Sequence, residues 1–243
     1  MKLYGLLGQS LTHSFSKNYF QEKFTKNGIQ NVEYQNFEIP RINDFTEILR
    51  KNKSLAGLNV TFPYKELIMP FLDEISPEAQ MIGAVNTIHI KDGKTIGYNT
   101  DFLGFEQSLL SFLQGNIKRA LVLGTGGASK AVCFALKRLG ITYQLVSRRN
   151  MEGSITYDQM ISELIFPNTL IINCTPVGTF PKTEQKPPIP YHFLKKTHFL
   201  YDLVYNPEET TFLQLGKQKG CKIKNGFEML VLQAEASWEI WNS

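Results

Sequence analysis

The sequence predicts an α/β protein of two domains, and three of its features lead to that expectation. The chain has 243 residues, more than the roughly 100–200 residues of a usual single domain. Short apolar runs alternate with longer helical patterns, an arrangement typical of a parallel sheet wound with helices. This pattern ends at Gly115 and then starts afresh with a new strand. We therefore expect a domain boundary within residues 101–117.

The composition narrows the classes of protein to which the chain can belong. Hydrophobic residues make up 42% and charged residues 20%, values near the globular average. The net charge of +4 arises without a long run of Lys and Arg, which argues against a nucleic-acid partner and favours small anionic ligands. No stretch approaches the ~20 apolar residues that cross a bilayer, and the first residues do not resemble a signal peptide. We expect a cytoplasmic protein with no membrane partner, either a monomer or a homodimer.

The cysteines and histidines show no pattern of metal ligands. Cys133, Cys174 and Cys221 are odd in number and far apart, with no CxxC or CxxH spacing. We expect all three to be buried free thiols in a reducing compartment. The histidines likewise lack a ligand spacing, so the sequence predicts chemistry without a metal.

The expected elements of the first domain follow from apolar runs and turn residues. A helix is expected over residues 17–27, because apolar residues recur there on one face. Pro63 stands where a further helix can begin. The strands 85–90 and 95–98 are joined by Asp92-Gly93, a pair typical of hairpin turns. The other expected strands cover residues 3–7, 34–39 and 57–61.

The second half of the chain shows the same alternation. A helix is expected to start at Asp101 and end at Gly115, and another to cover residues 226–241. The proline-rich stretch 180–190 is expected to be a surface loop. Apolar runs predict strands over residues 120–123, 144–147, 170–173 and 199–204, with helices between them.

A glycine-rich turn follows the first of these strands. The string Gly124-Thr125-Gly126-Gly127-Ala128-Ser129 resembles the GxGxxG turn of dinucleotide-binding domains, with Ser129 in place of the third glycine. Glycines allow the tight turn, and the free N–H groups of the following helix bind a pyrophosphate. The alternative is an ordinary glycine-rich turn, which would not need three glycines within four positions. The sequence therefore predicts a Rossmann-like domain that binds a dinucleotide.

The end of the next strand indicates which dinucleotide is bound. An NAD enzyme usually places Asp or Glu about 20 residues beyond the first glycine, to bind the ribose 2′-hydroxyl. Here the strand ends in Ser147, Arg148 and Arg149, with no acidic residue. Guanidinium groups suit a 2′-phosphate by charge and by planar stacking on adenine. We expect NADP; the alternative is that both arginines merely end an exposed strand.

Candidates for catalysis and substrate binding lie in the first domain and at its end. Lys65 is expected in the first turn of a helix, where the dipole disfavours a cation and so favours proton exchange; its alternative is a side chain in water. Asp101 precedes a helix and is either its N-cap or a charge partner of Lys65. Ser14 and Ser16 precede the first helix, where they are N-caps or hold a carboxylate with the helix N–H groups. Asn86 lies at a strand end, and a turn role is its alternative.

Eight strings of the chain, taken in order, resemble those of the shikimate dehydrogenase family along nearly the whole length. Eight matches in one order leave chance convergence as a poor explanation. The strings are SLTHSFS (10–16), NVTFPYK (59–65), GAVNT (83–87), GYNTD (97–101), GTGGAS (124–129), INCTPVG (172–178), DLVYNP (202–207) and NGFEMLVLQ (225–233).

The resemblance implies a fold and a reaction. The reaction is the reduction of 3-dehydroshikimate to shikimate with NADPH, in the biosynthesis of chorismate and the aromatic amino acids. The fold is a substrate domain of residues 1–101 and an NADP-binding Rossmann-like domain of residues 102–225, with a cleft between them. The C-terminal helix, within residues 226–243, is implied to pack back onto the substrate domain.

The resemblance also implies a role for each matching residue. Lys65 would be the acid–base, paired with Asp101. Ser14 and Ser16 would bind the substrate carboxylate, and the substrate hydroxyls would be bound by Thr61, Asn86, Asp101 and Gln233, with Tyr205 nearby. Leu203 and Gly226 would contact the nicotinamide. Residues 124–128 would bind the pyrophosphate, and Arg148 and Arg149, beside Ser147, the 2′-phosphate.

Three places depart from the usual strings of the family. Ser147-Arg148-Arg149 stands where Asn-Arg-Thr is common, so the charge is kept while the adenine contacts differ. Only residues 150–169 separate Arg149 from Leu170, too few for the usual helix and its connections, which predicts a trimmed cofactor domain. Thr179-Phe180 replaces a Gly-Met pair beside the expected nicotinamide.

Two rival functions fit the sequence less well. A quinate/shikimate dehydrogenase that prefers NAD would be expected to have an acidic residue at the strand end, and that residue is missing. A catalytically silent NADP-sensing protein would have no need for Lys65 and Asp101 together, and the sequence has both.

Overall fold

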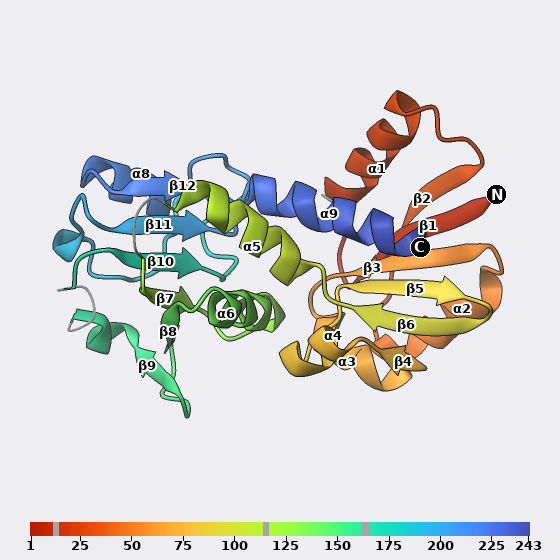
Figure 1. Ribbon diagram of the computed structural model, residues 1–243, viewed down its shortest axis with the longest axis horizontal. Coiled ribbons are helices and arrows are strands. Elements are labelled where there is room, and N and C mark those ends of the chain that lie inside the picture. The colour runs from red at the N-terminus through yellow and green to blue at the C-terminus, as the bar shows by residue number, and fades with distance from the viewer. Residues whose placement is uncertain (12–14, 114–116, 162–165) are drawn as a thin grey trace. The chain divides into compact units, whose positions relative to one another are not determined.

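The chain divides into two compact units. The computed structural model describes residues 1–11, 15–113, 117–161 and 166–243. Unit 1 consists of Met1–Thr100 and Ala234–Ser243, and unit 2 of Asp101–Gln233. Each unit contains its own sheet, six-stranded over the described ranges (Figure 1). The chain thus leaves the first unit between Thr100 and Asp101 and returns to it within its last helix.

Unit 1 is built on a mixed sheet with the strand order β2-β1-β3-β5-β6-β4. β1 pairs in parallel with β2 and β3, and β4 in parallel with β6, whereas β5 is antiparallel to both β3 and β6. Its elements are β1 (Lys2–Gly8), α1 (Phe15–Lys26), β2 (Val32–Glu38), η1 (Ile42–Asp44), α2 (Phe45–Lys51), β3 (Leu55–Val60), α3 (Tyr64–Leu67), η2 (Met69–Phe71), β4 (Glu74–Ile75), α4 (Pro77–Ile82), β5 (Thr87–Lys91), β6 (Lys94–Tyr98) and the end of α9 (Phe227–Trp241), where η denotes a 3₁₀ helix.

The predicted hairpin is confirmed and explains why this sheet is not purely parallel. Asp92 and Gly93 both have positive φ, 51° and 79°, which is the backbone conformation that a tight two-residue hairpin turn requires. The two strands of a hairpin run in opposite directions, so one of them must oppose a neighbouring strand. β5 takes that place, and its pairing with β3 sets Asn59 opposite Thr87. The helices α2 and α4 were not predicted from the sequence.

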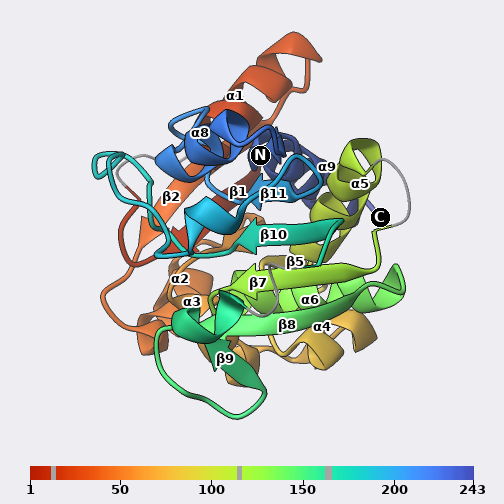
Figure 2. The same ribbon diagram turned by 90° about the vertical axis from the view of Figure 1, so that its left-hand side faces the viewer.

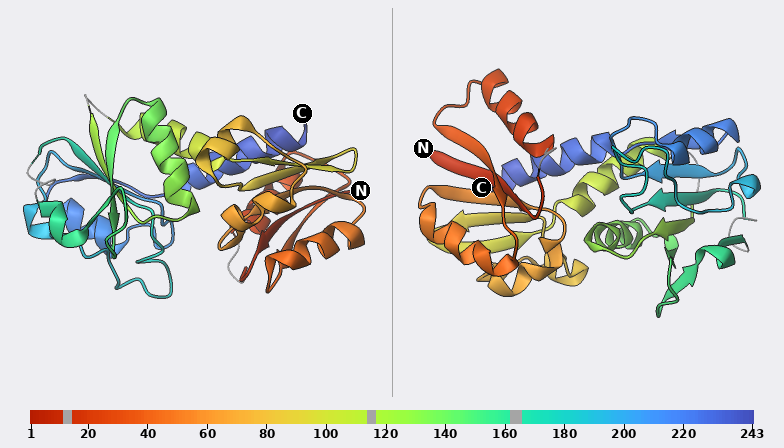
Figure 3. Two further views of the ribbon diagram at one scale, coloured as in Figure 1. Left: turned by 90° about the horizontal axis from the view of Figure 1, so that it is seen from below. Right: turned by 180° about the vertical axis from the view of Figure 1, so that it is seen from behind.

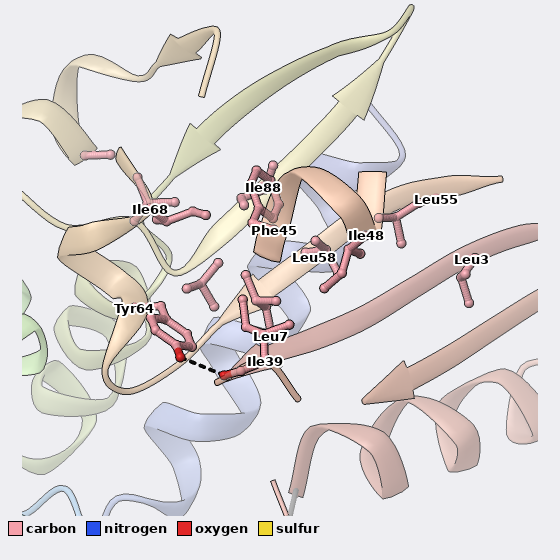
Figure 4. Packing of buried hydrophobic residues seen from close by; sticks show 13 residues of the cluster. Leu3, Leu7, Ile39, Phe45, Ile48, Leu55, Leu58, Tyr64, Ile68 and Ile88 are labelled. Carbon is pink, nitrogen blue, oxygen red and sulfur yellow. Dashed lines mark hydrogen bonds between the residues drawn. The ribbon is translucent and has the colours of Figure 1, made fainter. Parts of the chain in front are cut away.

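Both faces of the unit 1 sheet are covered by apolar side chains, as alternation along β1 shows. Leu3 and Leu7 pack into a cluster with residues of α2, α3 and α4 on one face (Figure 4). Tyr4 and Leu6 belong to a second cluster, with residues of α1 and of the end of α9. Figures 1 and 3 show these two groups of helices on opposite sides of the sheet. Successive side chains of a strand point to opposite faces, so burial on both faces requires helices on each.

Unit 2 is built on a parallel sheet with the strand order β12-β11-β10-β7-β8-β9, of which Figure 1 labels all six strands and Figure 2 labels β11 to β9. α8 covers one face of this sheet, and α5 and α6 pack together beside the other. Its elements are α5 (Asp101–Phe112), β7 (Arg119–Leu123), α6 (Gly127–Arg138), β8 (Thr142–Ser147), β9 (Ser154–Thr156), η3 (Tyr157–Met160), β10 (Thr169–Asn173), η4 (Tyr191–Phe193), β11 (Phe199–Asp202), α8 (Thr211–Gln218), β12 (Lys222–Lys224) and the start of α9.

The four central strands of unit 2 confirm the predicted ones, apart from their ends. The strand predicted over residues 199–204 ends at Asp202, where the backbone turns. Because these strands are parallel, the residues that follow β7, β8, β10 and β11 gather along one edge of the sheet. Ligands of doubly wound α/β sheets bind outside this carboxyl edge, where the strand order reverses. In unit 2 the reversal lies between β7 and β10.

The helix predicted to start at Asp101 is α5, and it begins at that residue. Its predicted end, Gly115, lies outside the described residues. Within the described ranges, no helix is both long enough and apolar enough to cross a membrane.

Candidate active site

The glycine turn connects β7 to α6 at the carboxyl edge of the unit 2 sheet. Gly124 has a φ of 105°, and a Cβ there would lie 3.0 Å from Thr175 Cγ2, so both backbone conformation and space require glycine. Gly126 is the N-cap residue of α6, and a Cβ added there would meet no atom within 4 Å. Ser129 is buried, and its hydroxyl donates to the Gly126 carbonyl at 2.7 Å. The first N–H groups of α6 therefore face a space that a ligand can approach.

The arginine pair lies at the end of the neighbouring strand. β8 ends at Ser147, whose hydroxyl accepts a hydrogen bond from the Arg149 N–H at 3.3 Å. Both Arg148 and Arg149 are exposed. The Arg148 charge also reaches the half-buried Tyr157 of η3, where it opposes the rise in the phenol pKa that burial causes. Two guanidinium groups thus stand beside the glycine turn, along the same sheet edge.

A third part of this edge follows β10 and β11 and centres on Asp202. This carboxylate is fully buried and accepts hydrogen bonds from Asn173 Nδ2 at 2.9 Å, from the Val204 N–H at 3.0 Å and from Thr210 Oγ1 at 2.6 Å. Burial raises its pKa to about 6, although each of the three donors acts to lower it. Asp202 therefore fixes three segments of unit 2 around one carboxylate.

The two residues expected at the nicotinamide lie side by side in this region. Leu203 follows Asp202, and its N–H donates to the Asn173 carbonyl at 2.9 Å. A Cβ on Gly226 would lie 2.1 Å from the Leu203 carbonyl oxygen, so only glycine allows the two backbones to approach. The structure thus brings Leu203 and Gly226 together within unit 2. Tyr205, two residues farther along, is half-buried, and burial raises its pKa.

In unit 1, Thr61 and Lys65 lie just beyond the end of β3. The Thr61 N–H donates to the Leu7 carbonyl at 2.9 Å, and the Lys65 carbonyl accepts from the Val85 N–H at 2.7 Å. Lys65 is the second residue of α3, as predicted, but α3 has four residues only. A single helical turn has a weak dipole, so the dipole supports proton exchange at Lys65 less strongly than the sequence suggested.

Asn86 is buried next to these residues and is held by Thr100. Its Oδ1 accepts the Thr100 N–H at 2.6 Å, and its Nδ2 donates to Thr100 Oγ1 at 2.9 Å. The Asn86 carbonyl also accepts the Val60 N–H at 2.8 Å, which ties this loop to the end of β3. The end of β3 and the loop before β5 therefore bring Thr61, Lys65 and Asn86 into one region of unit 1.

Other predicted residues fall in separate places. Ser16 lies inside α1, which begins at Phe15, so its predicted alternative as an N-cap is wrong; Ser14 lies outside the described residues. Asp101 is the first residue of α5 in unit 2. Gln233, on α9, donates from Nε2 to the Leu230 carbonyl at 2.8 Å within the same unit.

The cysteines follow the prediction with one exception. All three are free thiols, and Cys133 and Cys221 are buried, whereas Cys174 is half-buried. Cys174 is exposed in part because it lies in the loop after β10, at the open edge of the sheet. Across the residues that the structure describes, no three His, Cys, Asp or Glu side chains form a group suited to a metal ion.

Comparisons with known proteins agree with this geometry. A family model described as the shikimate dehydrogenase substrate binding domain matches residues 6–88. A shikimate dehydrogenase (NADP(+)) of Caldicellulosiruptor saccharolyticus is 37% identical to this chain over 257 residues, covering 99% of this chain and 91% of the relative. The chain belongs to the shikimate dehydrogenase family. The family predicted from the eight strings is thereby confirmed.

Solved structures of shikimate dehydrogenases share the whole fold. A chorismate mutase/shikimate 5-dehydrogenase fusion protein from Clostridium acetobutylicum is 37% identical, with a TM-score of 0.90 over 100% of this chain and 91% of that chain. The shikimate 5-dehydrogenase of Thermus thermophilus, solved in complex with NADP(H) and shikimate, is 31% identical, with a TM-score of 0.84 over 99% and 93%. The predicted α/β fold with a Rossmann-like half is therefore confirmed.

In this member of the shikimate dehydrogenase family, β8 ends at Ser147 and β10 begins at Thr169; a trimmed segment between them stays a prediction. The described part of residues 150–169 holds β9 and the 3₁₀ helix η3. The sequence analysis missed the role of Asp202 and the buried side chains of Asn59 and Ser237. Asp202 stands in one of the eight strings. The signal that could have identified it was its position, a polar residue at the end of an apolar strand.

Proposed function

We propose that the chain catalyses the reversible, NADP-dependent reduction of 3-dehydroshikimate to shikimate. The observation that carries this proposal is the carboxyl edge of unit 2, where a glycine turn at a helix N-terminus stands beside two exposed arginines, in a chain that matches shikimate dehydrogenases along its whole length. Helix N–H groups bind a pyrophosphate, and guanidinium groups select a 2′-phosphate over a 2′-hydroxyl.

The residues of unit 2 fit NADP by their shape and their charge. No atom lies within 4 Å of a Cβ built on Gly126, so a diphosphate would approach the N–H groups of Gly127 and Ala128 there, with Gly124 and Thr125 completing the turn. Arg148 and Arg149, beside Ser147, would hold the 2′-phosphate. Leu203 and Gly226, whose backbones pack closely against each other, would line the nicotinamide end. When bound, NADPH supplies the hydride.

The substrate would be held by polar side chains, and the fold has already oriented one of them, Asn86. Ser14 and Ser16 would bind its carboxylate. Thr61, Asn86, Asp101 and Gln233 would bind its hydroxyl groups, with Tyr205 close by. Asn86 is oriented by its two hydrogen bonds to Thr100, so it would lose little entropy on binding a hydroxyl.

Lys65 would act as the acid–base at the 3-keto oxygen. During reduction its ammonium donates a proton to the oxygen that becomes the hydroxyl; during oxidation the neutral amine takes that proton back. Asp101 would be its charge partner and would hold the ammonium toward the substrate oxygen.

The test follows nicotinamide absorbance with the purified chain, shikimate or quinate, and NADP⁺ or NAD⁺ in all four combinations. We expect turnover with shikimate and NADP⁺ to exceed the other three. Faster turnover of quinate with NAD⁺ would support the rival dehydrogenase. Binding of NADP⁺ without turnover of either substrate would support the silent sensor and overturn the proposal.

A further inference from the structure

Three hydroxyl groups meet in the interior of unit 1. The Oγ of Ser237, on α9, lies 2.8 Å from Thr87 Oγ1 and 3.1 Å from Thr100 Oγ1, and these two threonine oxygens lie 3.2 Å apart. All three side chains are fully buried, at 0% exposure. Thr87 lies on β5, Thr100 between β6 and α5, and Ser237 on α9. We refer to Thr87, Thr100 and Ser237 as the hydroxyl triangle.

The hydroxyl triangle supports one side of the predicted substrate site directly. Thr100 holds both ends of the Asn86 amide, through its N–H and its Oγ1. Thr87 Oγ1 also donates to Asn86 Oδ1 at 3.1 Å. The rotation of the Asn86 side chain is therefore set by two members of the triangle, and Thr100 is bonded covalently to Asp101.

A second chain of hydrogen bonds leaves the triangle at Ser237. Asn59 Nδ2 donates to Ser237 Oγ at 2.9 Å, and Tyr34 donates from its hydroxyl to Asn59 Oδ1 at 2.8 Å. Burial raises the pKa of Tyr34, and a hydrogen bond with Ser16 acts against that rise. One continuous network of hydrogen bonds thus runs from Tyr34 through Asn59 to Ser237.

Ser237 is the point at which the two branches join. One branch ends at Asn86, which is proposed to bind a substrate hydroxyl, and the other at Tyr34 on β2. Asn59 meets the triangle at Ser237, and at the longer distance of 3.4 Å it also reaches Thr87. In a buried network, losing one member leaves several polar groups short of a partner.

We propose that Ser237 is a positioning residue, whose hydroxyl orients Asn86 through Thr87 and Thr100 for shikimate binding. This inference rests on the proposed function. It assigns a part in substrate recognition to the C-terminal helix, through a side chain that does not itself touch the substrate. Cofactor binding, which belongs to unit 2, should not depend on it.

The experiment compares Ser237→Ala with Ser108→Ala. Ser108 is a matched control, since it is also a fully buried serine that bonds another hydroxyl, Tyr201 at 2.8 Å, but in unit 2. We expect Ser237→Ala to raise the KM for shikimate by about 5- to 10-fold, the loss of roughly one buried hydrogen bond, with an unchanged KM for NADP⁺. Ser108→Ala should leave the KM for shikimate unchanged, while its urea-unfolding midpoint should be similar to that of Ser237→Ala.

A double-mutant cycle separates positioning from general stability. If Ser237 acts through Asn86, the effects of Ser237→Ala and Asn86→Ala on the KM for shikimate will not add in the double variant. Additive effects, or equal changes in both Michaelis constants, would overturn the inference.

Calorimetric titration with shikimate keeps the inference separate from the proposed function. Wild-type protein that binds shikimate but does not turn it over would sink the proposed reaction alone, and a weaker affinity in Ser237→Ala would still support positioning. An unchanged affinity in Ser237→Ala, or wild-type protein that binds no shikimate, would overturn the inference.

Discussion

Asp202 should make unit 2 less stable as the pH rises through the weakly acidic range. Its pKa is raised from 3.8 to about 6 by burial, so the folded state retains a proton that the unfolded chain has already released. Between these two values folding takes up a proton, and stability falls with increasing pH by up to about 1.4 kcal/mol per pH unit. The full penalty is about 3 kcal/mol, absent below about pH 4 and complete above about pH 6.

The variant Asp202→Asn isolates this penalty, because an amide of the same size does not ionise. Urea unfolding of both proteins is followed from about pH 4 to about pH 8 by circular dichroism, since both tryptophans, Trp238 and Trp241, lie in unit 1 and do not report on unit 2. All other groups cancel in the difference between the two curves. That difference should shift in favour of the variant by about 3 kcal/mol as the pH rises. Curves that stay parallel would refute the reasoning, and Asp158→Asn, an exposed carboxylate of the same unit, provides the control.

Three further substitutions test separate parts of the account. Replacing Arg148 and Arg149 by Ala should raise the KM for NADP⁺ by roughly 10- to 100-fold and leave that for NAD⁺ nearly unchanged, because NAD lacks the 2′-phosphate; equal changes in steady-state assays would contradict the assignment. Gly57→Ala should destabilise unit 1 by about 1–3 kcal/mol, measured by tryptophan fluorescence in urea, because the added Cβ would lie 2.3 Å from Trp241 Nε1. Gly226→Ala should lower kcat by up to roughly 100-fold, since the Leu203 backbone must move away; a wild-type kcat would remove Leu203 from the nicotinamide site.

The fold of unit 2 could be predicted from the sequence because its signals are local. The strands of a parallel sheet are continuous apolar runs, and the turn from β7 to α6 needs glycine at Gly124 for its positive φ. Likewise, the hairpin of β5 and β6 follows from Asp92-Gly93 alone.

The buried polar network of unit 1 could not be predicted in the same way. Ser237 is separated from Asn59 by 178 positions and from Thr87 by 150, so no periodicity in the sequence connects them. In the sequence, Ser237 is a small residue on an apolar helix, and only the fold shows that its hydroxyl lies against other hydroxyls. The short helices α2 and α4 were missed because six or seven residues show too little periodicity.

Replacing Lys65 tests the central claim of an NADP-dependent dehydrogenase most directly. Lys65→Ala, with Lys53→Ala as an exposed lysine control in the same unit, is assayed for turnover of shikimate and for shikimate affinity by calorimetry. The account predicts that kcat falls by roughly 10²- to 10⁴-fold in Lys65→Ala while affinity changes little, and that Lys53→Ala behaves as the parent. A Lys65→Ala variant that turns over shikimate at the parental rate would contradict it.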